Sequence, residues 1–442
     1  MSGHLENSRN GCALHGALQT IEAIEGAVPI IHSTAGCGLH HYLGGIRGSG
    51  SSLPGVTGGI PLSSTNIGEK HVVFGGGSRL REQLKNTVKT VRGDLYAVLS
   101  GCATEMVGDD IPAMTKEGRE QGFPVIHAGT PGFRGGSHPG YQLAVRALIE
   151  QLPSLPGPEA KPPTGLVNIW GIVPQQDLFW QGHLEELSRL LRELGFTANT
   201  FFGFGQGVDA WRRIPHAALN LVVSPWGNDA AHLLEEKYGT PWIDFAGLPV
   251  GGGATGRLIS SLAEQLRLDD TTVEMVCRRE EEVFNRQIAR AADKYYTNHF
   301  QREFALVGET ALVFGLSEFL VDTLGLLPRL IIVTDNPPER AREKIADRLQ
   351  KQLQEFPAAV VFSEDSGEIT DLIRASGAEL VVGSSLECQA AASLDVPLLP
   401  ISFPVRDRLI LTKGYAAYRG GLTLLEDLGT AILSHRAGAI RG

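Results

Sequence analysis

Hydrophobic residues in this chain gather into short runs of strand length, and longer amphipathic segments separate the runs. Runs rich in Val, Ile, Leu and aromatic residues favour buried β-strands, whereas the intervening segments have helical periodicity. Regular alternation of strand and helix predicts parallel sheets covered by helices, an α/β fold. The predicted strands are VPIIHS, DLYAVLS and PVIHAG in the first third of the chain, then LVNIWGIV, TANTFFGF, LNLVVS and TPWIDF, and finally EFALVG, RLIIVTD, AAVVFS, AELVVG and PLLPIS.

The alternation restarts twice along the 442 residues, which agrees with about three domains of ordinary size. Residues 152–164 hold five prolines in a polar stretch, a composition typical of a linker. We therefore predict three Rossmann-like α/β/α domains with parallel sheets. Their predicted bounds are 1–155, 165–256 and 301–442, and residues 257–300, which are charged and helically periodic, are predicted to form connecting helices.

Three cysteines stand where a loop or predicted strand gives way to a helical pattern: Cys12, Cys37 and Cys102, each directly after a glycine. A helix N-terminus lowers the pKa of a thiol through its free N–H groups and its dipole, and iron–sulfur clusters need thiolates. The alternative is that each is a small buried hydrophobic residue, as free cysteines often are. Cys37 and Cys102 follow predicted parallel strands, where bound groups are expected.

Composition narrows the classes of function. The net charge of −10 argues against a nucleic-acid partner, and no apolar run is long enough for a transmembrane helix. The start MSGHLENSRN lacks a basic and apolar leader. Five widely spread cysteines do not make a disulfide framework and fit a reducing compartment. We expect a cytoplasmic protein that binds neither nucleic acid nor membranes.

The cysteines belong to longer motifs. Gly11-Cys12-Ala13 precedes Gly36-Cys37, then come Ser64-Thr65-Asn66 and the segment EKHVVFG from Glu69, and finally CATEMVGDD from Cys102. In combination and at these intervals, the motifs resemble component 1 of nitrogenase and of nitrogenase-like reductases. The resemblance extends over the whole chain, because subunits of this family contain three α/β units of this size.

The resemblance implies a role for the three cysteines. Cys12, Cys37 and Cys102 resemble one subunit's share of the ligands of an [8Fe-7S] P-cluster, with a [4Fe-4S] cluster as the alternative. Three thiolates cannot complete the larger cluster, so a homologous α-type subunit is implied, in an α2β2 assembly served by an ATP-dependent iron–sulfur reductase. The segment Thr130-Pro131-Gly132-Phe133 resembles the family segment that passes close to the cluster. Some β-subunits carry a serine ligand there, and Gly132 has no hydroxyl.

The resemblance favours a β-type chain. An α-type chain holds the catalytic iron–sulfur cofactor through a cysteine near a helix like Glu235 to Gly239, and through a later histidine. Ala231 occupies the cysteine position here, and His435 is the only histidine after residue 299. Cys277 and Cys388 are interpreted as packed helix residues. FPVRDR from Phe403 and the glycine-rich segment from Gly414 also resemble β-type subunits, so the catalytic cofactor is expected in the partner.

Within the family the substrate remains open. The chain lacks the long N-terminal extension of β-subunits from the molybdenum enzyme, and its start GCALHG differs from theirs. It resembles more closely the methylthio-alkane reductases, which cleave C–S bonds in small organic sulfides. The alternatives are the β-subunit of an alternative-metal nitrogenase that reduces dinitrogen, and a non-enzymatic scaffold for cofactor assembly.

Further residues near the cysteines have less specific interpretations. His40 and His41 follow Cys37 and could line the cluster or simply pack. Gly75-Gly76-Gly77 resembles a phosphate-binding turn only weakly. Glu105, Asp109 and Asp110 are predicted to cap helices and contact a subunit rather than bind metal.

Overall fold

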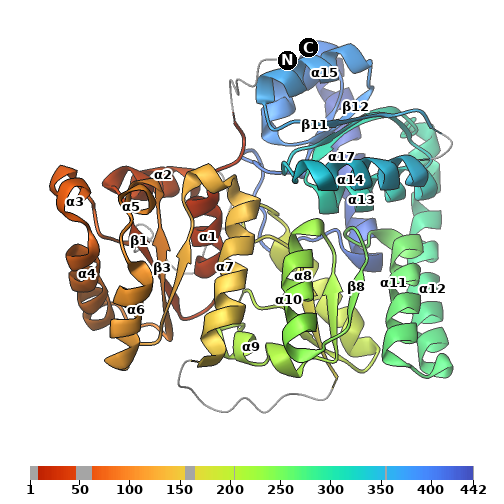
Figure 1. Cartoon of the computed structure of the whole chain (residues 1–442). Coiled ribbons are helices and arrows are strands. Elements are labelled where there is room, and N and C mark those ends of the chain that lie inside the picture. The colour runs from red at the N-terminus through yellow and green to blue at the C-terminus, as the bar shows by residue number, and fades with distance from the viewer. Residues whose placement is uncertain (1–7, 46–61, 155–164, 204, 354–355, 442) are drawn as a thin grey trace.

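The computed structural model describes residues 8–45, 62–154, 165–203, 205–353 and 356–441. Most of the predicted proline-rich linker lies outside these residues. Three separate sheets, all of whose strands pair in parallel, confirm the predicted fold class of three Rossmann-like units. Figure 1 shows the three units as an orange, a green and a cyan-to-blue lobe.

The first sheet has the order β2-β1-β3-β4, so the chain starts near the centre, moves to one edge and returns to the other side. Its strands are β1 (Ala27–His32), β2 (Ser63–Ser64), β3 (Leu95–Ser100) and β4 (Val125–Gly129). The helices of this domain are α1 (Ala13–Glu22), α2 (Ala35–Gly45), α3 (Glu69–Phe74), α4 (Gly77–Thr90), α5 (Cys102–Val107), α6 (Ile111–Glu120) and α7 (Ser137–Gln151). The two-residue β2 was not predicted, because it consists of polar serines.

The second and third sheets also have a doubly wound topology, with strand orders β6-β5-β7-β8 and β11-β10-β9-β12-β13. The second domain contains β5 (Leu166–Trp170), α8 (Trp180–Glu193), β6 (Thr197–Asn199), α9 (Val208–Arg212), β7 (Leu219–Val222), α10 (Asn228–Tyr238) and β8 (Trp242–Asp244). The third contains β9 (Glu303–Gly308), α13 (Thr310–Glu318), β10 (Leu327–Val333), α14 (Glu339–Gln352), β11 (Ala359–Phe362), α15 (Ser366–Ser376), β12 (Leu380–Gly383), α16 (Cys388–Leu394) and β13 (Leu398–Pro400). Every hydrophobic run predicted as a strand overlaps a strand of one of the three sheets.

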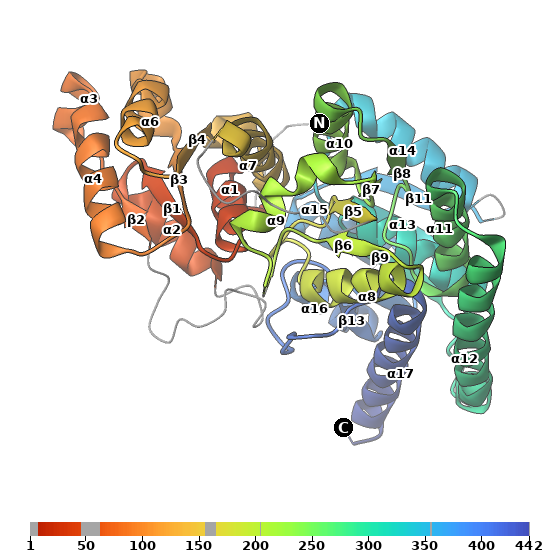
Figure 2. The same ribbon diagram turned by 90° about the horizontal axis from the view of Figure 1, so that it is seen from below.

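Long helices join the second and third domains. The helices α11 (Gly251–Leu266) and α12 (Asp270–Thr297) form a projecting pair, and the C-terminal helix α17 (Ala417–Arg441) packs against both of them and against α8 (Figure 2). One apolar core runs from α1 in the first domain to α17. The three domains therefore meet through hydrophobic interfaces rather than through flexible hinges.

Two glycines bring α1 and α7 into close contact. A Cβ added to Gly140 would lie 2.8 Å from the carbonyl carbon and 2.9 Å from the Cα of Ala13, and closer still to its oxygen. Gly16 meets the backbone of Ser137 in the same way. Side chains larger than hydrogen have no space here, so the glycines fix the distance between the two helices.

The first described residues extend away from the first domain and pack on the third. Arg9, which is 1% exposed, forms a buried ion pair with Glu387. Asn10 donates to the carbonyl oxygen of Thr334 at 2.8 Å. These contacts anchor the segment just before Cys12 to a domain that is more than three hundred residues away in sequence.

Candidate iron–sulfur site

The three cysteines predicted as ligands all lie at or near the N-terminus of a helix. Cys12 is the N-cap of α1, Cys37 lies in the first turn of α2, and Cys102 is the first residue of α5. The helices α2 and α5 follow the adjacent strands β1 and β3, between which the strand order of the sheet reverses. In doubly wound sheets, ligands bind in the crevice at this point because the chain departs from it in two directions.

Cys12 does not follow a strand of this sheet, and a different contact holds it near the other two cysteines. The residues flanking it are held by the loop that follows β4, through a bridge between Cys12 and Gly136 and a 2.8 Å hydrogen bond from the Ala13 N–H to the oxygen of Gly135. The same loop contains the predicted cluster-proximal segment. Because Cys12 and this loop are far apart in the sequence, no local sequence pattern predicts their contact.

Gly132 lies between two of the thiols. Its N–H donates to the sulfur of Cys102 at 3.1 Å. A Cβ at Gly132 would be 3.2 Å from the Cβ of Cys12, 3.3 Å from Cys102 Sγ and 3.6 Å from Cys12 Sγ. The glycine leaves the space beside both sulfurs open, and a larger residue would fill it.

The thiols are close enough to affect one another electrostatically. Burial raises the pKa of the Cys12 thiol, and the nearby Cys37 and Cys102 raise it further, while the N–H groups of His15 and Leu14 lower it. Negative thiolates that repel one another are stabilised when cationic iron binds them. Thiols that are close together beside a glycine, and that repel one another when ionised, therefore fit the ligands of an iron–sulfur core.

Polar side chains contact two of the sulfurs. The hydroxyl of Ser33 lies 3.3 Å from Cys37 Sγ, and Nδ1 of His15 lies 3.0 Å from Cys12 Sγ. Burial, followed by the nearby His41 and His40, lowers the pKa of His15 to about 4, so the ring is neutral at pH 7. Its Nδ1 faces the Cys12 sulfur, and the ring also interacts with the backbone of Cys37. The Cys12-x-x-His15 spacing, one turn of helix, is the signal that the sequence analysis missed.

One side of the site is open. Cys102 is exposed, and so are the apolar side chains next to the ligands. Met106, one turn beyond Cys102, is 80% exposed, and Phe133, next to Gly132, is 64% exposed. Within the described part of the chain, no three His, Cys, Asp or Glu side chains are grouped as they would be around a single metal ion.

The other residues singled out near the cysteines have structural partners. His41 is buried, with Nε2 at 2.9 Å from the Glu22 carboxylate, and the ring of His40 lies 5.3 Å from that of His15. Asp110 caps α6 by accepting from the N–H of Ala113, as predicted for a capping residue. Gly76 donates to Asp109, so this N–H of the glycine-rich turn is already occupied.

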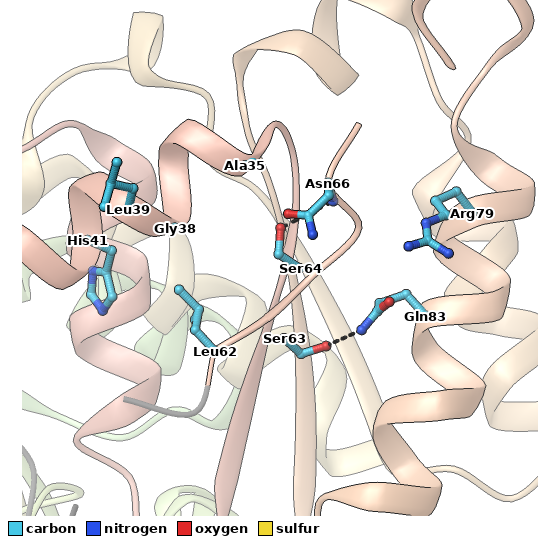
Figure 3. A pocket seen from close by; sticks show the side chains of 10 residues that line it. All are labelled: Ala35, Gly38, Leu39, His41, Leu62, Ser63, Ser64, Asn66, Arg79 and Gln83. Carbon is cyan, nitrogen blue, oxygen red and sulfur yellow. Dashed lines mark hydrogen bonds between the residues drawn. The ribbon is translucent and has the colours of Figure 1, made fainter. Parts of the chain in front are cut away.

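A cavity of about 460 Å³ opens beside the site, between α2, β2 and α4 (Figure 3). Arg79 and Gln83 point into it from α4, and His41 borders it from α2. Its polar groups are largely paired, since Gln83 donates to Ser63 at 2.9 Å and Arg79 donates to the carbonyl oxygen of Thr65 at 3.1 Å. None of the three cysteines lines this cavity.

Protein side chains occupy the junction where the three domains meet. His138 from the first domain lies 3.2 Å from the Glu309 carboxylate of the third. Trp226 from the second domain donates to Asp335 of the third at 2.7 Å, and Thr310 donates to the same carboxylate. Ala231 is fully buried in α10 and offers no ligand. Cys277 is partly buried on α12, in agreement with its interpretation as a packed helix residue. Cys388 is the first residue of α16 and is exposed, so its interpretation as a packed residue is wrong.

The arrangement defines a class of protein: three doubly wound α/β domains with a group of thiols at the switch point of the first. A family model for nitrogenase component 1 type oxidoreductases matches residues 12–433. This match covers nearly the whole chain, and the protein belongs to that family.

Relatives include β-type chains with different roles. The chain is 24% identical to the nitrogenase molybdenum-iron protein beta chain of Frankia alni, over 97% of this chain and 82% of that one. It is 25% identical to the vanadium-iron protein beta chain of Trichormus variabilis, over 95% and 91% of the two chains. It is also 25% identical to the iron-molybdenum cofactor biosynthesis protein NifN of Rhodobacter capsulatus, over 95% and 90%. These relatives confirm the predicted β-type resemblance.

A solved structure, Nitrogenase Cp1 at pH 6.5, superposes with a TM-score of 0.81 at 20% identity, over 98% of this chain and 94% of that one. At this identity the likeness establishes the fold. No helix among the described residues has both the length and the apolar character needed to cross a membrane.

Proposed function

We propose that this chain is the β-type subunit of a two-component, nitrogenase-like reductase, and that it holds half of an iron–sulfur cluster shared with an α-type partner. The observation that carries the proposal is the convergence of Cys12 and Cys102 on Gly132, together with the electrostatic proximity of Cys37. The proposed cluster is an [8Fe-7S] P-cluster, and a [4Fe-4S] cluster is the alternative. Bound there, it would accept and release single electrons between a reductase and the partner's catalytic cofactor.

The chain's own residues would hold the thiolates and set their basicity. Hydrogen bonds to a cluster sulfur stabilise its reduced form, because they disperse negative charge. The N–H of Gly132 donates to the sulfur of Cys102, and Nδ1 of the neutral His15 ring lies within hydrogen-bonding distance of the sulfur of Cys12. The Ser33 hydroxyl has the same relation to Cys37. The Gly132 position leaves cysteine thiolates as the expected ligands, since no hydroxyl is present there.

The open side of the site is proposed to face the α-type subunit. Apolar side chains as exposed as Met106 and Phe133 are costly in water and common at subunit interfaces. Covering them would also exclude water from the exposed Cys102. We expect an α2β2 heterotetramer, and we expect the chain to be iron-poor or to aggregate when it is produced alone. A monomer carrying a full cluster would contradict a shared site.

The ATP-dependent iron–sulfur reductase is proposed to dock on α3. This short helix ends in Val72, Val73 and Phe74, which are all exposed, and Phe74 is 86% exposed. It contacts α5, the helix that begins at Cys102, so a protein docked there would lie close to the proposed cluster. Electron transfer over a short distance requires such proximity.

For the reaction in the partner, we propose reductive cleavage of C–S bonds in small methylthio-alkanes. The unusual GCALHG start, in which His15 faces Cys12, supports a chain distinct from the molybdenum enzyme. Each of two alternative functions is supported by a relative of this chain. The vanadium-iron beta chain favours dinitrogen reduction, and NifN favours a non-enzymatic scaffold for cofactor assembly. Assays of the native complex with ethyl methyl sulfide, dinitrogen and acetylene separate these outcomes, and a scaffold would reduce none of them.

The cluster assignment is tested by metal analysis. Cys37→Ala should lower the iron content of the purified complex, because it removes a thiolate ligand. Cys277→Ala is the matched control, since Cys277 is also partly buried on a helix but lies on α12. Equal iron in the wild type and in Cys37→Ala would overturn the assignment.

Product ratios test the proposal that this chain relays electrons while the partner subunit reduces the substrate. Cys102→Ser should slow organosulfide reduction and proton reduction by similar factors, because both reactions draw on the same electrons. Rates would be measured across a series of electron fluxes at saturating reductase. A large change in product ratio that does not depend on flux would mean that this chain contributes directly to substrate reduction, and the β-type proposal would then fail.

A further inference from the structure

A continuous set of contacts connects the exposed end of α3 to the backbone that carries two of the cysteines. At its outer end, Phe74 is followed by Gly75, which has a φ of +86°, and by the buried Gly76. The Gly76 N–H donates to Oδ1 of Asp109 at 2.7 Å. A Cβ at Gly76 would lie 2.9 Å from Ile67 and 3.1 Å from the His32 ring, so the turn is packed directly on both.

Asp109 joins this turn to a buried histidine. Its second oxygen, Oδ2, lies 3.1 Å from Nε2 of His32, whose side chain is fully buried. The opposite nitrogen, Nδ1, lies 3.1 Å from the hydroxyl of Thr65. Burial lowers the pKa of His32 despite the nearby Asp109, so the neutral ring donates to Asp109 and accepts from Thr65. Both ring nitrogens are occupied, and the ring has one orientation.

The main chain of His32 and Ser33 continues the connection to the cysteines. The carbonyl oxygen of His32 accepts from the N–H of Gly101, the residue before Cys102, at 3.0 Å, and from the hydroxyl of Thr104 at 2.7 Å. Ser33 contacts the sulfur of Cys37. A parallel link runs from Gly76 through Ile67, whose N–H donates to the Ser33 oxygen at 2.9 Å.

We propose that His32 and Asp109 are positioning residues that transmit contact at the α3–α4 turn to the backbone holding Cys37 and Cys102. This inference rests on the proposed function, because it needs a cluster at the cysteines and a reductase on α3. Every link is a hydrogen bond from a buried or nearly buried group or a direct packing contact, and the Asp109 side chain is only 6% exposed. A displacement of the turn is therefore carried to the thiolates rather than absorbed by a flexible side chain.

The test compares two adjacent aspartates. In Asp109→Asn, the side chain keeps its size but offers one acceptor oxygen, so the N–H of Gly76 and that of His32 can no longer both be accepted. Asp110→Asn is the matched control, because Asp110 caps α6 and does not contact the turn or His32. Both would be made in the native complex. Two rates are then measured: reduction driven by the ATP-dependent iron–sulfur reductase at saturation, and reduction driven by a europium(II) chelate.

We expect Asp109→Asn to lower the reductase-driven rate about three- to tenfold and to leave the chelate-driven rate within about twofold of wild type. Asp110→Asn should change neither rate by more than about twofold. A purely structural role of Asp109 would lower both rates together and would overturn the inference. If Asp109→Asn does not assemble, Thr65→Val provides the same comparison, because it removes the hydroxyl that orients His32.

A double-mutant cycle identifies the route. Phe74→Ala should also lower the reductase-driven rate, and if Phe74 acts through Asp109, the double variant should be no slower than the slower single variant. Additive losses would mean that the two residues act independently, which overturns the coupling. The iron content of Cys37→Ala is measured beside this cycle. Wild-type iron in that variant rejects the proposed cluster, whereas a lost cluster in Cys37→Ala combined with equal rate ratios in Asp109→Asn rejects only the positioning role.

Discussion

Replacing Gly140 by Ala should disturb the site through the packing of α1 on α7. The new methyl group would lie 2.8 Å from the carbonyl carbon of Ala13, while ordinary contacts to a Cβ begin at 3.4 Å. The difference, 3.4 − 2.8 = 0.6 Å, is a lower bound on the displacement of α1, because the carbonyl oxygen of Ala13 would be closer still. Because the contacted atoms are backbone atoms of Ala13, Cys12 next to it must move as well.

Two opposing effects determine how much Gly140→Ala changes the free energy of unfolding. Overpacking of a tight interface costs about 1–3 kcal/mol, and the greater helix propensity of Ala returns about 0.5–1 kcal/mol. The net expectation is a loss of about 1–2 kcal/mol in the free energy of unfolding. The effect on the metal should be larger, since metal–ligand distances tolerate only about 0.2 Å. A shift of 0.6 Å at Cys12 therefore predicts loss of iron from the complex.

Gly256→Ala is the control. Gly256 also lies inside a helix, α11, but a Cβ there would meet nothing within 4 Å, so Ala should stabilise by about 0.5–1 kcal/mol. Urea denaturation and iron analysis of the two variants in the assembled complex make the comparison. If Gly140→Ala has the denaturation midpoint and the iron content of Gly256→Ala, the argument from α1–α7 packing is wrong.

Three other predictions concern buried polar groups. Burial raises the pKa of Glu309 from 4.5 to about 7, so folding favours its protonated form. The stability that this form contributes is full below about pH 4.5 and is lost as the pH rises to about 7. Glu309→Gln should remove this loss, which is measured as the change in denaturation midpoint from pH 5 to 8. Trp226→Phe removes one of three hydrogen bonds to the buried Asp335 carboxylate and leaves only those from Thr310, which should cost about 1–3 kcal/mol. Trp242→Phe, whose bond to Glu235 is exposed, should cost less than about 0.5 kcal/mol, and equal losses in urea titrations would contradict the assigned role of Trp226. Ser33→Ala removes the hydroxyl beside Cys37 and should make the cluster potential more negative by roughly 40 mV, the equivalent of a hydrogen bond worth about 1 kcal/mol, in a redox titration followed by EPR; an unchanged potential would show that the hydroxyl does not donate to the sulfur.

The fold could be predicted because hydrophobic runs and helical segments alternate without interruption. Each strand whose sequence was apolar was found, whereas β2 was missed because Ser63 and Ser64 pair with β1 through the backbone alone. The predicted third domain ends in α17, yet this helix packs on α8, α11 and α12 as well. Local patterns indicate where a helix forms but not which distant helix it will contact.

The site could be predicted in part for the same reason. Cys37 and Cys102 follow adjacent parallel strands, so the topology alone brings their segments together. The approach of Cys12 to Gly132 needed the family resemblance, because it depends on a loop more than a hundred residues away. The His32–Asp109 contact joins residues 77 positions apart through side chains, and no periodicity marks such a pair.

The anchoring of Arg9 to Glu387 has a consequence for the biogenesis of the protein. These residues are 378 positions apart, and at about 5–20 residues per second Glu387 is synthesised roughly 20–75 s after Arg9. Until then the residues just before Cys12 have no partner on the third domain, whereas Cys12 itself is held within the first domain by Gly135 and Gly136. The contact between Arg9 and Glu387 is therefore expected to form only after the third domain has been translated, later than the packing that places Cys12.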